Sequence, residues 1–157
     1  MTPRIGQGID FHKLDSGLRL FIGGIAIPSE KGCLAHSDGD VLLHAICDAL
    51  LGAAGLEDIG HHFPDTDPEY KNIDSKILLQ RSYRLLKAKG FTIVNIDSTV
   101  CLENPKIADY IPQMRSVIAG ILETNPAYIS IKATTTEKLG FIGHEEGIMA
   151  IAVALIM

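Results

Sequence analysis

The chain contains 157 residues, which falls within the roughly 100–200 residues of one ordinary domain, so we expect a single domain spanning residues 1–157. Hydrophobic residues make up 46% and charged residues 21% of the sequence, a composition that excludes a disordered or low-complexity chain. The 14 Lys and Arg residues against 19 Asp and Glu residues give a net charge of −5, which argues against nucleic acid or an anionic membrane as a partner.

The sequence contains no segment with the length expected of a membrane-spanning helix. The longest apolar run, residues 148–157, is about half of the ~20 residues that such a helix needs. Charged residues at positions 4, 10 and 13 precede any apolar run long enough for a signal peptide, so we expect a cytoplasmic protein. Cys33, Cys47 and Cys101 are odd in number and widely spaced, which argues against a disulfide framework or a cysteine-zinc ribbon.

Two strands and a long helix are expected in the first third of the chain. Residues 4–14 and 20–27 have the alternating, β-branched character of strands, and the turn signal at residues 15–17 predicts that they form a hairpin. Apolar residues recur at helical spacing over residues 37–51, which predicts a helix with Ser37 or Asp38 as N-cap and Gly52 or Gly55 as terminator. Residues 57–70 are too polar and broken for a regular element, so we expect a loop that Phe63 fixes to the body of the protein.

The rest of the chain alternates between helices and strands. We expect a second helix that Asp74 or Ser75 caps and that ends at Gly90, and a third helix whose entry Pro105 and Pro112 bracket. Strands are expected over residues 91–102, 128–133 and 147–157, with residues 134–146 as a connection.

This order of elements predicts an α+β fold with a single mixed β-sheet and helices packed on one face. Because the last strand is apolar on both sides, the other face of the sheet must also be covered, and self-association would cover it.

Three residues have the chemistry and spacing of metal ligands. Asp10 and His12 are two positions apart on a predicted strand, so both project from the same face, and His44 lies on the adjacent helix. One carboxylate and two imidazoles would leave a fourth position open, as in a catalytic zinc site; a hydrogen-bonded histidine at the end of a sheet is the alternative. Asp40 or Asp48, one turn away on either side, is a candidate to orient His44, although helix capping and solvation explain both equally well.

Three other segments carry groups that suit phosphates or hydroxyls. His36 and Ser37 precede a helix N-terminus, which favours an anion, whereas simple capping also explains Ser37. Asp65 and Asp67 offer two carboxylates for a cation or substrate hydroxyls, with an Asx-turn as the alternative. Residues 134–138 place three threonines, a glutamate and a lysine together, which suits a diphosphate with Mg²⁺ but is also typical of a threonine-rich strand end.

Several motifs taken together resemble one family. They are GQGIDFH (6–12), AHSDGDVLLHA (35–45), DIG (58–60), FPDTDP (63–68), NPK (104–106), IPQMR (111–115) and KATTTEKLGFIG (132–143). The sequence resembles the 2-C-methyl-D-erythritol 2,4-cyclodiphosphate synthase family of non-mevalonate isoprenoid biosynthesis, over nearly the whole chain and in the same order. The resemblance implies that the domain is catalytic and forms a homotrimer, with sheets facing the threefold axis and active sites between adjacent subunits.

The resemblance also implies residue roles. The zinc ligands fall on Asp10, His12 and His44, and Glu137 matches the ligand of a second divalent cation, Mg²⁺ or Mn²⁺. The positions implied to hold the substrate within one subunit are Asp10, His12, His36, Ser37, Asp58, Gly60, Phe63, Pro64, Asp65, Thr66 and Asp67. Those implied to bind the nucleotide and phosphates, from the neighbouring subunit, are Leu102, Glu103, Asn104, Pro105, Lys106, Ile107, Ala108, Ala133, Thr134, Thr135, Thr136, Glu137, Phe141 and His144, the last standing where the family is expected to have an arginine.

The implied activity is that of a lyase. It converts 4-diphosphocytidyl-2-C-methyl-D-erythritol 2-phosphate to the 2,4-cyclodiphosphate with release of CMP, and the resemblance gives His36 and Thr135 the role of stabilising the transition state. Two alternatives use the same residues: a metal-dependent phosphohydrolase, which would activate a water molecule, and a non-catalytic nucleotide-binding trimer.

Overall fold

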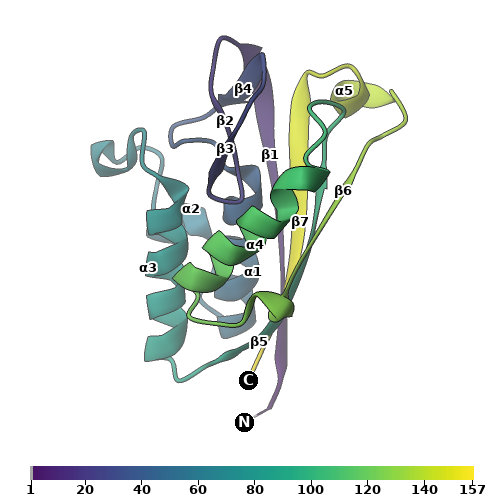
Figure 1. The fold of residues 1–157 in the computed structure, drawn as a ribbon. Helices are drawn as coiled ribbons and strands as arrows, with labels where there is room; N and C mark the ends of the chain where they lie inside the picture. Colours follow the sequence, from purple (N-terminus) through teal and green to yellow (C-terminus); the bar gives the residue numbers. More distant parts are fainter. Residues whose placement is uncertain (1) are drawn as a thin grey trace.

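A mixed β-sheet forms the frame of the structure, a computed structural model that describes residues 2–157 (Figure 1). Its strand order is β4-β1-β7-β5-β6, and the strands are β1 (Arg4–Ser16), β4 (Lys31–Leu34), β5 (Ile93–Cys101), β6 (Ile129–Thr134) and β7 (Gly147–Ile156). β5 and β6 run parallel, whereas the other neighbours are antiparallel. The mixed sheet of the sequence prediction is therefore confirmed.

Helices cover one face of this sheet. The helices are α1 (Val41–Ala54), α2 (Ile59–His62), α3 (Ser75–Ala88), α4 (Ile111–Ile121) and α5 (Gly140–Gly143), with 3-10 turns η1 (Pro68–Tyr70), η2 (Ala108–Tyr110) and η3 (Pro126–Tyr128). Figure 1 shows α1, α3 and α4 on the same side of the sheet, and the hydrophobic core lies between these helices and the strands. The α+β class with helices on one face is confirmed. Within residues 2–157, none of the helices has the length and apolarity needed to cross a membrane.

Two glycines of β1 allow α1 to pack directly on the strand. A Cβ atom added at Gly6 would lie 1.9 Å from the carbonyl oxygen of Ala49, and one added at Gly8 would lie 1.9 Å from the carbonyl oxygen of Ala45. Heavy atoms do not approach this closely, so any side chain here would push the helix away. The glycines of β1 and the alanines of α1 thus set a short distance between the strand and the helix.

The opposite face of the sheet is apolar and accessible along its central strands. On β1, Ile5, Ile9 and Phe11 are 73%, 46% and 52% exposed, and on β7 Val153 is 39% exposed. The pairing of β1 with β7 places these side chains on one face, because directly opposite residues project from the same side of a sheet. Figure 1 shows α1, α3 and α4 on the other face, whereas the short α5 lies at one end of this face, where Phe141 is 6.1 Å from Phe11 between ring centroids. An exposed, contiguous apolar surface of this kind is typical of an interface.

The predicted hairpin between residues 4–14 and 20–27 is wrong. β2 (Leu20–Ile22) and β3 (Ile25–Ile27) pair with each other in a separate two-stranded sheet, whereas β1 pairs with β4 and β7. The reason is the Gly23-Gly24 pair, whose φ angles of 64° and 81° supply the left-handed backbone that a two-residue hairpin turn requires. This turn is shorter than the one expected at residues 15–17, and the sequence analysis did not identify β4.

Three local expectations also need correction. The N-cap of α1 is Asp40, whose side chain accepts from the amide of Leu43, and not Ser37 or Asp38; Gly55 ends the helix as one of the two expected terminators. The 57–70 segment contains the four-residue α2 and the turn η1, because Asp58 and Asp67 cap short helical turns in it. The connection over residues 134–146 likewise contains α5.

Candidate functional site

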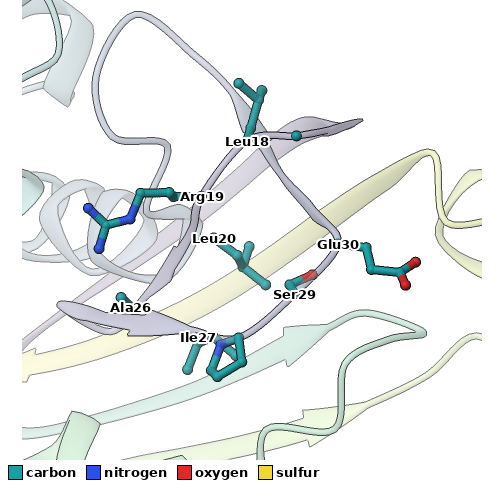
Figure 2. Close-up of a pocket in the computed structure, with 9 residues that line it drawn as sticks. Leu18, Arg19, Leu20, Ala26, Ile27, Ser29 and Glu30 are labelled. Carbon is teal, nitrogen blue, oxygen red and sulfur yellow. The ribbon is translucent and has the colours of Figure 1, made fainter.

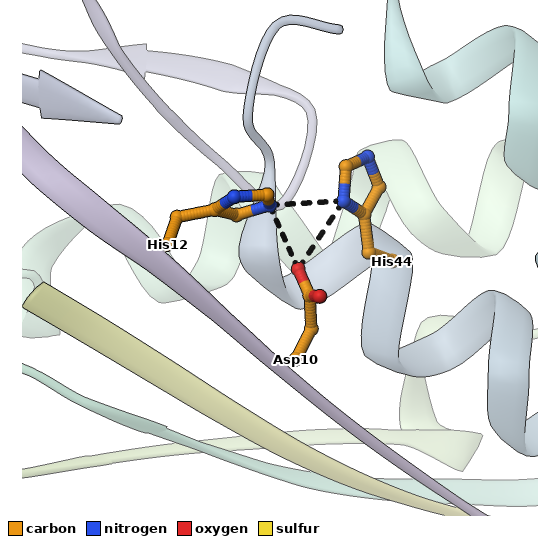
Figure 3. A group of neighbouring side chains, drawn as sticks. All are labelled: Asp10, His12 and His44. Atoms are coloured by element: carbon orange, nitrogen blue, oxygen red, sulfur yellow. Dashed lines mark hydrogen bonds and ion pairs between the residues drawn. The ribbon is translucent and has the colours of Figure 1, made fainter. Parts of the chain in front are cut away.

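Asp10, His12 and His44 converge at one point on the helix-covered face of the sheet (Figure 3). The Oδ2 atom of Asp10 lies 2.8 Å from Nε2 of His12 and 3.2 Å from Nδ1 of His44, and these two nitrogens are 3.1 Å apart. The ligand atoms of the three side chains all lie within 4.8 Å of one another. We call these three residues the triad.

The alternation of β1 and the position of α1 bring the triad together. Gly8, Asp10 and His12 are at successive even positions, so the two polar side chains project toward the helix that packs on the glycine. His44 lies in the first turn of α1, next to Ala45, whose carbonyl oxygen faces Gly8. The close packing of strand and helix therefore determines the distance between the ligands on β1 and the ligand on α1.

The charge states within the triad are coupled. Burial raises the pKa of Asp10, but hydrogen bonds and charge interactions with His12 and His44 outweigh it and leave the pKa below its ordinary value. Burial lowers the pKa of His44, but the hydrogen bond and negative charge of Asp10 outweigh it and leave the pKa raised. The carboxylate is thus held ionised, as a metal ligand must be.

The triad fits a divalent metal ion by its donor chemistry. It offers two imidazole nitrogens and one carboxylate oxygen, the ligand types of catalytic zinc sites, in which three protein ligands leave one coordination position open. The spacing of these donor atoms is close enough for one ion to reach all of them.

The expected partners of His44 are different from the observed ones. Asp40 is fully buried, and its carboxylate accepts from the amides of Gly23, Gly24 and Leu43 at 2.9, 2.7 and 3.0 Å. Asp48 accepts from the amide of Ile59 at 2.7 Å. Both carboxylates therefore hold backbone elements in place, and the hypothesis that one of them orients the ring of His44 is wrong.

Two serines instead lie against the other ring nitrogen of His44. Its Nε2 atom is 2.8 Å from Oγ of Ser75 and 3.3 Å from Oγ of Ser37. Ser75 also contacts Asp38, with 2.5 Å between Oγ and Oδ1. The sequence analysis missed these contacts of Ser75 and Asp38. Ser75 is 31 positions from His44 and 37 positions from Asp38, so no local spacing links them, and each residue has an ordinary capping explanation.

A cavity of about 590 Å³ lies beside the triad. Many of the residues expected to hold the substrate within one subunit line this cavity, together with two histidines of the triad. The lining includes His12, His36, Ser37, His44, Gly60, Phe63, Pro64, Asp65 and Thr66. Phe63 and Tyr70 pack edge-on, with ring centroids 5.6 Å apart, and both are partly buried against the hydrophobic core, so Phe63 fixes the loop to the body of the protein as expected. The loop and the histidines of the triad thus share one cavity.

Asp58 and Asp67, also expected to hold the substrate, use their side chains as helix caps. Asp58 accepts from the amide of His61 at 2.8 Å, and Asp67 accepts from the amide of Glu69 at 2.9 Å. The ring Nε2 of His36 lies 3.2 Å from the carbonyl oxygen of Asp67. These contacts position the loop that borders the cavity, and they leave the second carboxylate oxygen of each aspartate available.

A second group of candidate residues lies away from this cavity, at the ends of the parallel strands β5 and β6. The group comprises residues 102–108 and 133–137 with Phe141 and His144, and none of these lines the cavity at the triad among the residues described. Asn104, Pro105 and Lys106 instead border another hollow of about 610 Å³ with Lys31 and Glu145. One chain therefore presents the two groups on separate surfaces.

The threonine-rich segment has an unusual backbone. Thr136 Oγ1 donates to the carbonyl oxygen of Leu139 at 2.6 Å, and Thr135 Oγ1 accepts from the amide of Glu137 at 3.2 Å. Glu137 and Lys138 both have left-handed backbones, with φ angles of 54° and 64°. Such conformations are uncommon for residues with side chains and concentrate at functional sites. His144 ends α5.

The hollow of about 470 Å³ between residues 17–20 and 26–30 has a different character (Figure 2). Arg19 and Glu30 are the charged residues of its lining, and Figure 2 shows their side chains extending in opposite directions. Arg19 stacks over Phe21, with its guanidinium carbon 5.0 Å from the ring centroid. Because its charged groups do not converge, this hollow lacks the arrangement expected of a catalytic site.

Comparisons with known proteins agree over the whole chain. A sequence model described as the YgbB family matches residues 3–157. A Bacteroides fragilis protein named 2-C-methyl-D-erythritol 2,4-cyclodiphosphate synthase is 58% identical over 156 residues, which is 99% of this chain and 98% of the relative. The structure of the bifunctional IspDF from Campylobacter jejuni matches 99% of this chain with 43% identity and a TM-score of 0.95, and this chain spans 42% of that longer protein. A Plasmodium falciparum IspF structure, described as a CDP complex, is 37% identical with a TM-score of 0.86, over 99% of this chain and 96% of that one.

Proposed function

This chain belongs to the YgbB family and has the family's activity, the synthesis of 2-C-methyl-D-erythritol 2,4-cyclodiphosphate, and from this premise we propose how its residues divide the work. The enzyme is a lyase of the non-mevalonate route to isoprenoids. Its substrate is 4-diphosphocytidyl-2-C-methyl-D-erythritol 2-phosphate and its second product is CMP, and we propose that it acts in the cytoplasm. The whole chain serves as one catalytic domain.

The reaction requires positioning more than a strong base. An oxygen of the 2-phosphate attacks the β-phosphorus of the diphosphate in the same molecule, the bond from that phosphorus to the CMP oxygen breaks, and an eight-membered ring closes. The nucleophile is already an anion, so the obstacles are the repulsion between phosphates and the entropy of ring closure. A site that clamps both ends of the substrate and supplies positive charge addresses both obstacles.

The triad supplies the clamp on one side. Asp10, His12 and His44 would hold a zinc ion, which when bound polarises and positions a phosphate oxygen. His36 and Ser37 line the same cavity, and their side chains would donate to phosphate oxygens. The Phe63–Asp67 loop would enclose the methylerythritol part and exclude water.

The second group of residues supplies the nucleotide side. Residues 102–108 would hold the cytidine, Thr134 to Thr136 would donate to the diphosphate, and Glu137 would hold Mg²⁺ or Mn²⁺, which neutralises charge on that diphosphate. Thr135 and His36 would stabilise the transition state from opposite ends. CDP in the related Plasmodium falciparum structure supports a cytidine-linked substrate.

A homotrimer would bring the two groups together. The apolar face of β1 and β7 carries exposed Ile5, Ile9 and Phe11, which a second and third copy would cover. Since the second group lies on a different surface from the cavity at the triad, a neighbouring copy can present its second group to that cavity. Each active site would then need residues from two chains.

The observation that carries this proposal is the convergence of the triad on a cavity of about 590 Å³. The test incubates the full-length protein with its substrate, with and without a chelator, and identifies products by mass. We expect the cyclic diphosphate and CMP, with the chelator abolishing both. Free phosphate would indicate the phosphohydrolase, and unchanged substrate with metal present would indicate a nucleotide-binding protein.

A mixed trimer tests the shared site. A His44→Ala chain and a Thr135→Ala chain are each expected to be nearly inactive, but a mixed trimer contains an interface in which both contributing surfaces are unaltered. Unfolding the two variants, refolding them together and assaying CMP release should restore activity. If mixed trimers confirmed by mass show no recovery, each site is contained within one chain and the proposal of a shared site is wrong.

A further inference from the structure

A chain of hydrogen bonds leads from the triad into the body of the protein through the ring of His44. Nδ1 of His44 faces Asp10 and His12, whereas Nε2 lies 2.8 Å from the hydroxyl of Ser75. That hydroxyl lies 2.5 Å from Oδ1 of Asp38. The order is thus metal ligand, serine, carboxylate.

The donors and acceptors in this series of hydrogen bonds determine where the protons of Ser75 and of Nε2 of His44 lie. The carboxylate of Asp38 accepts hydrogen bonds only, and it already accepts from the backbone amides of Asp40 and Ser75 at 3.1 and 3.0 Å. The Ser75 hydroxyl must therefore donate its single proton to Asp38, which leaves it as an acceptor toward His44. The hydrogen bond then requires a proton on Nε2 of His44, which leaves the lone pair of Nδ1 for a bound metal ion; without the ion, the carboxylate of Asp10 is an acceptor for a proton on Nδ1.

The second serine near Nε2 is a weaker partner and is compatible with the same tautomer. Oγ of Ser37 lies 3.3 Å from Nε2, longer than the contact to Ser75, and accepts from the amide of Gly39 at 3.2 Å. Accepting from the ring as well would also require the proton on Nε2. The Ser37 hydroxyl can either accept from the ring or donate to it, so Ser75 determines the tautomer.

The position of Ser75 is held by the backbone. Ser75 is fully buried and is the first residue of α3, where Asp74 caps the helix. Asp38 donates its amide to the carbonyl oxygen of Ile73 at 3.0 Å, in addition to accepting from the amide of Ser75. The start of α3 and the segment before α1 are thus tied to each other beside the ring of His44.

From these contacts we infer that Ser75 and Asp38 are positioning residues, which hold the ring of His44 in the tautomer and orientation that direct Nδ1 at the metal. Neither residue touches the ion, so both act through His44. The inference rests on the metal site of the proposed function. Partners of this kind set the ligand's protonation and angle, and their loss typically weakens metal binding by about 10- to 100-fold.

The first test measures Zn²⁺ affinity of the full-length protein by competition with a chromophoric chelator. We expect Ser75→Ala to weaken binding by about 10- to 100-fold and His44→Ala to weaken it further. Ser82→Ala is the matched control, because Ser82 is equally buried on the same helix and its hydroxyl has no hydrogen-bond partner within residues 2–157. We expect this control to bind Zn²⁺ like the unaltered protein.

The order of effects separates the two claims. If His44→Ala leaves Zn²⁺ affinity unchanged, the metal site itself is wrong. If His44→Ala abolishes binding but Ser75→Ala matches the Ser82→Ala control, only the positioning role is overturned. The double variant Asp38→Asn/Ser75→Ala should bind like Ser75→Ala alone, since Asp38 acts through Ser75; additive losses would contradict that order.

A second measurement does not depend on any variant folding. Nitrogen-15 chemical shifts of the His44 ring, recorded on the Zn²⁺-loaded protein so that Asp10 no longer competes for a proton on Nδ1, report which nitrogen binds the ion and which carries the proton. We expect the proton on Nε2 in the unaltered protein. A proton on Nδ1 in the unaltered protein would overturn the inference.

Discussion

The two faces of β1 differ in whether other parts of the same chain cover them. On the even-numbered face, Gly6 and Gly8 meet the backbone of α1, and Asp10 meets His44 of that helix. On the odd-numbered face, Ile5 and Ile9 remain 73% and 46% exposed. The even-numbered face of β1 is thus covered by α1 of the same chain, whereas the odd-numbered face, which we call the open face, remains exposed in a single chain.

This difference separates two requirements of the site. The position of each candidate metal ligand depends on contacts within one chain, because a helix packed at backbone distance leaves little freedom for a side chain that bridges it to the strand. The joining of substrate-binding groups depends on what covers the open face. Changes on the even face should therefore alter folding and metal binding, whereas changes on the odd face should alter assembly.

The largest effect is expected for Gly8→Ala. The added Cβ would lie 1.9 Å from the carbonyl oxygen of Ala45, a backbone atom that moves only if the whole helix moves. We expect a loss of at least about 3 kcal/mol in the free energy of unfolding and loss of metal binding, measured by urea denaturation and Zn²⁺ competition.

Gly120→Ala serves as the control for this glycine change. Gly120 is in α4, and a Cβ there would have nothing within 4 Å. We expect it to raise the free energy of unfolding by about 0.5–1 kcal/mol, because alanine restricts the unfolded chain. Equal effects of the two substitutions would contradict the close-packing explanation.

The open face is tested by Ile9→Lys. A charge at this position would have to be buried against another copy, so we expect the trimer to dissociate and activity to fall by at least about 100-fold, while each chain retains its fold and metal. Ile77→Lys is the matched control, since Ile77 is 41% exposed on α3. Mass measurement in solution and metal content check both variants; an intact, active Ile9→Lys trimer would contradict the assigned interface.

The sequence predicted elements where periodicity and caps coincide. The long helices and the strands β5, β6 and β7 follow apolar patterns that match their burial, as with Ile96, Ser98 and Val100 on the buried side of β5. The hairpin prediction was wrong because strand pairing is set by contacts distant in sequence, such as β1 with β7, which no local turn signal encodes.

The site was predictable to a similar degree. The two-residue spacing of Asp10 and His12 indicates a shared face, and the position of His44 on the adjacent predicted helix adds a third candidate ligand, which the family resemblance also implies. The partner of His44 was predicted incorrectly, because helical spacing favours Asp40 and Asp48 on the same helix, whereas the observed contact comes from Ser75 at the start of another helix. Tertiary hydrogen bonds of this type have no signature in the spacing of residues.

Asp40, the buried N-cap of α1, tests how strongly the stability of the fold depends on the protonation of a buried carboxyl group. Burial raises the pKa of Asp40 from its ordinary 3.8 to about 6, although three backbone amides partly oppose the shift. The folded protein therefore holds the proton of the Asp40 carboxyl more tightly than the unfolded chain does. The stabilisation of the fold that results is complete below pH 3.8 and is lost as the pH rises through about 6.

We therefore expect a pH-dependent difference between the unaltered protein and Asp40→Asn. Relative to the variant, the free energy of unfolding should fall on the order of 3 kcal/mol between the two pKa values and stay constant above them. Urea denaturation of metal-free protein across this pH range measures the difference. A difference independent of pH would show that Asp40 is ionised in the folded protein throughout.

The smallest effect is expected at Asp48, which connects α1 to the substrate loop. Its carboxylate accepts from the amide of Ile59 at 2.7 Å and so fixes α2, whose Gly60 lines the cavity. Asp48→Ala should leave that amide without its acceptor and raise KM about fivefold with little change in kcat, equivalent to about 1 kcal/mol of lost positioning. Asp48→Asn keeps an acceptor oxygen at this place, so its KM should remain close to that of the unaltered enzyme. Steady-state kinetics separates the two parameters. A fall in kcat at constant KM in Asp48→Ala would contradict this prediction and would mean that Asp48, one helical turn after His44, stabilises the transition state.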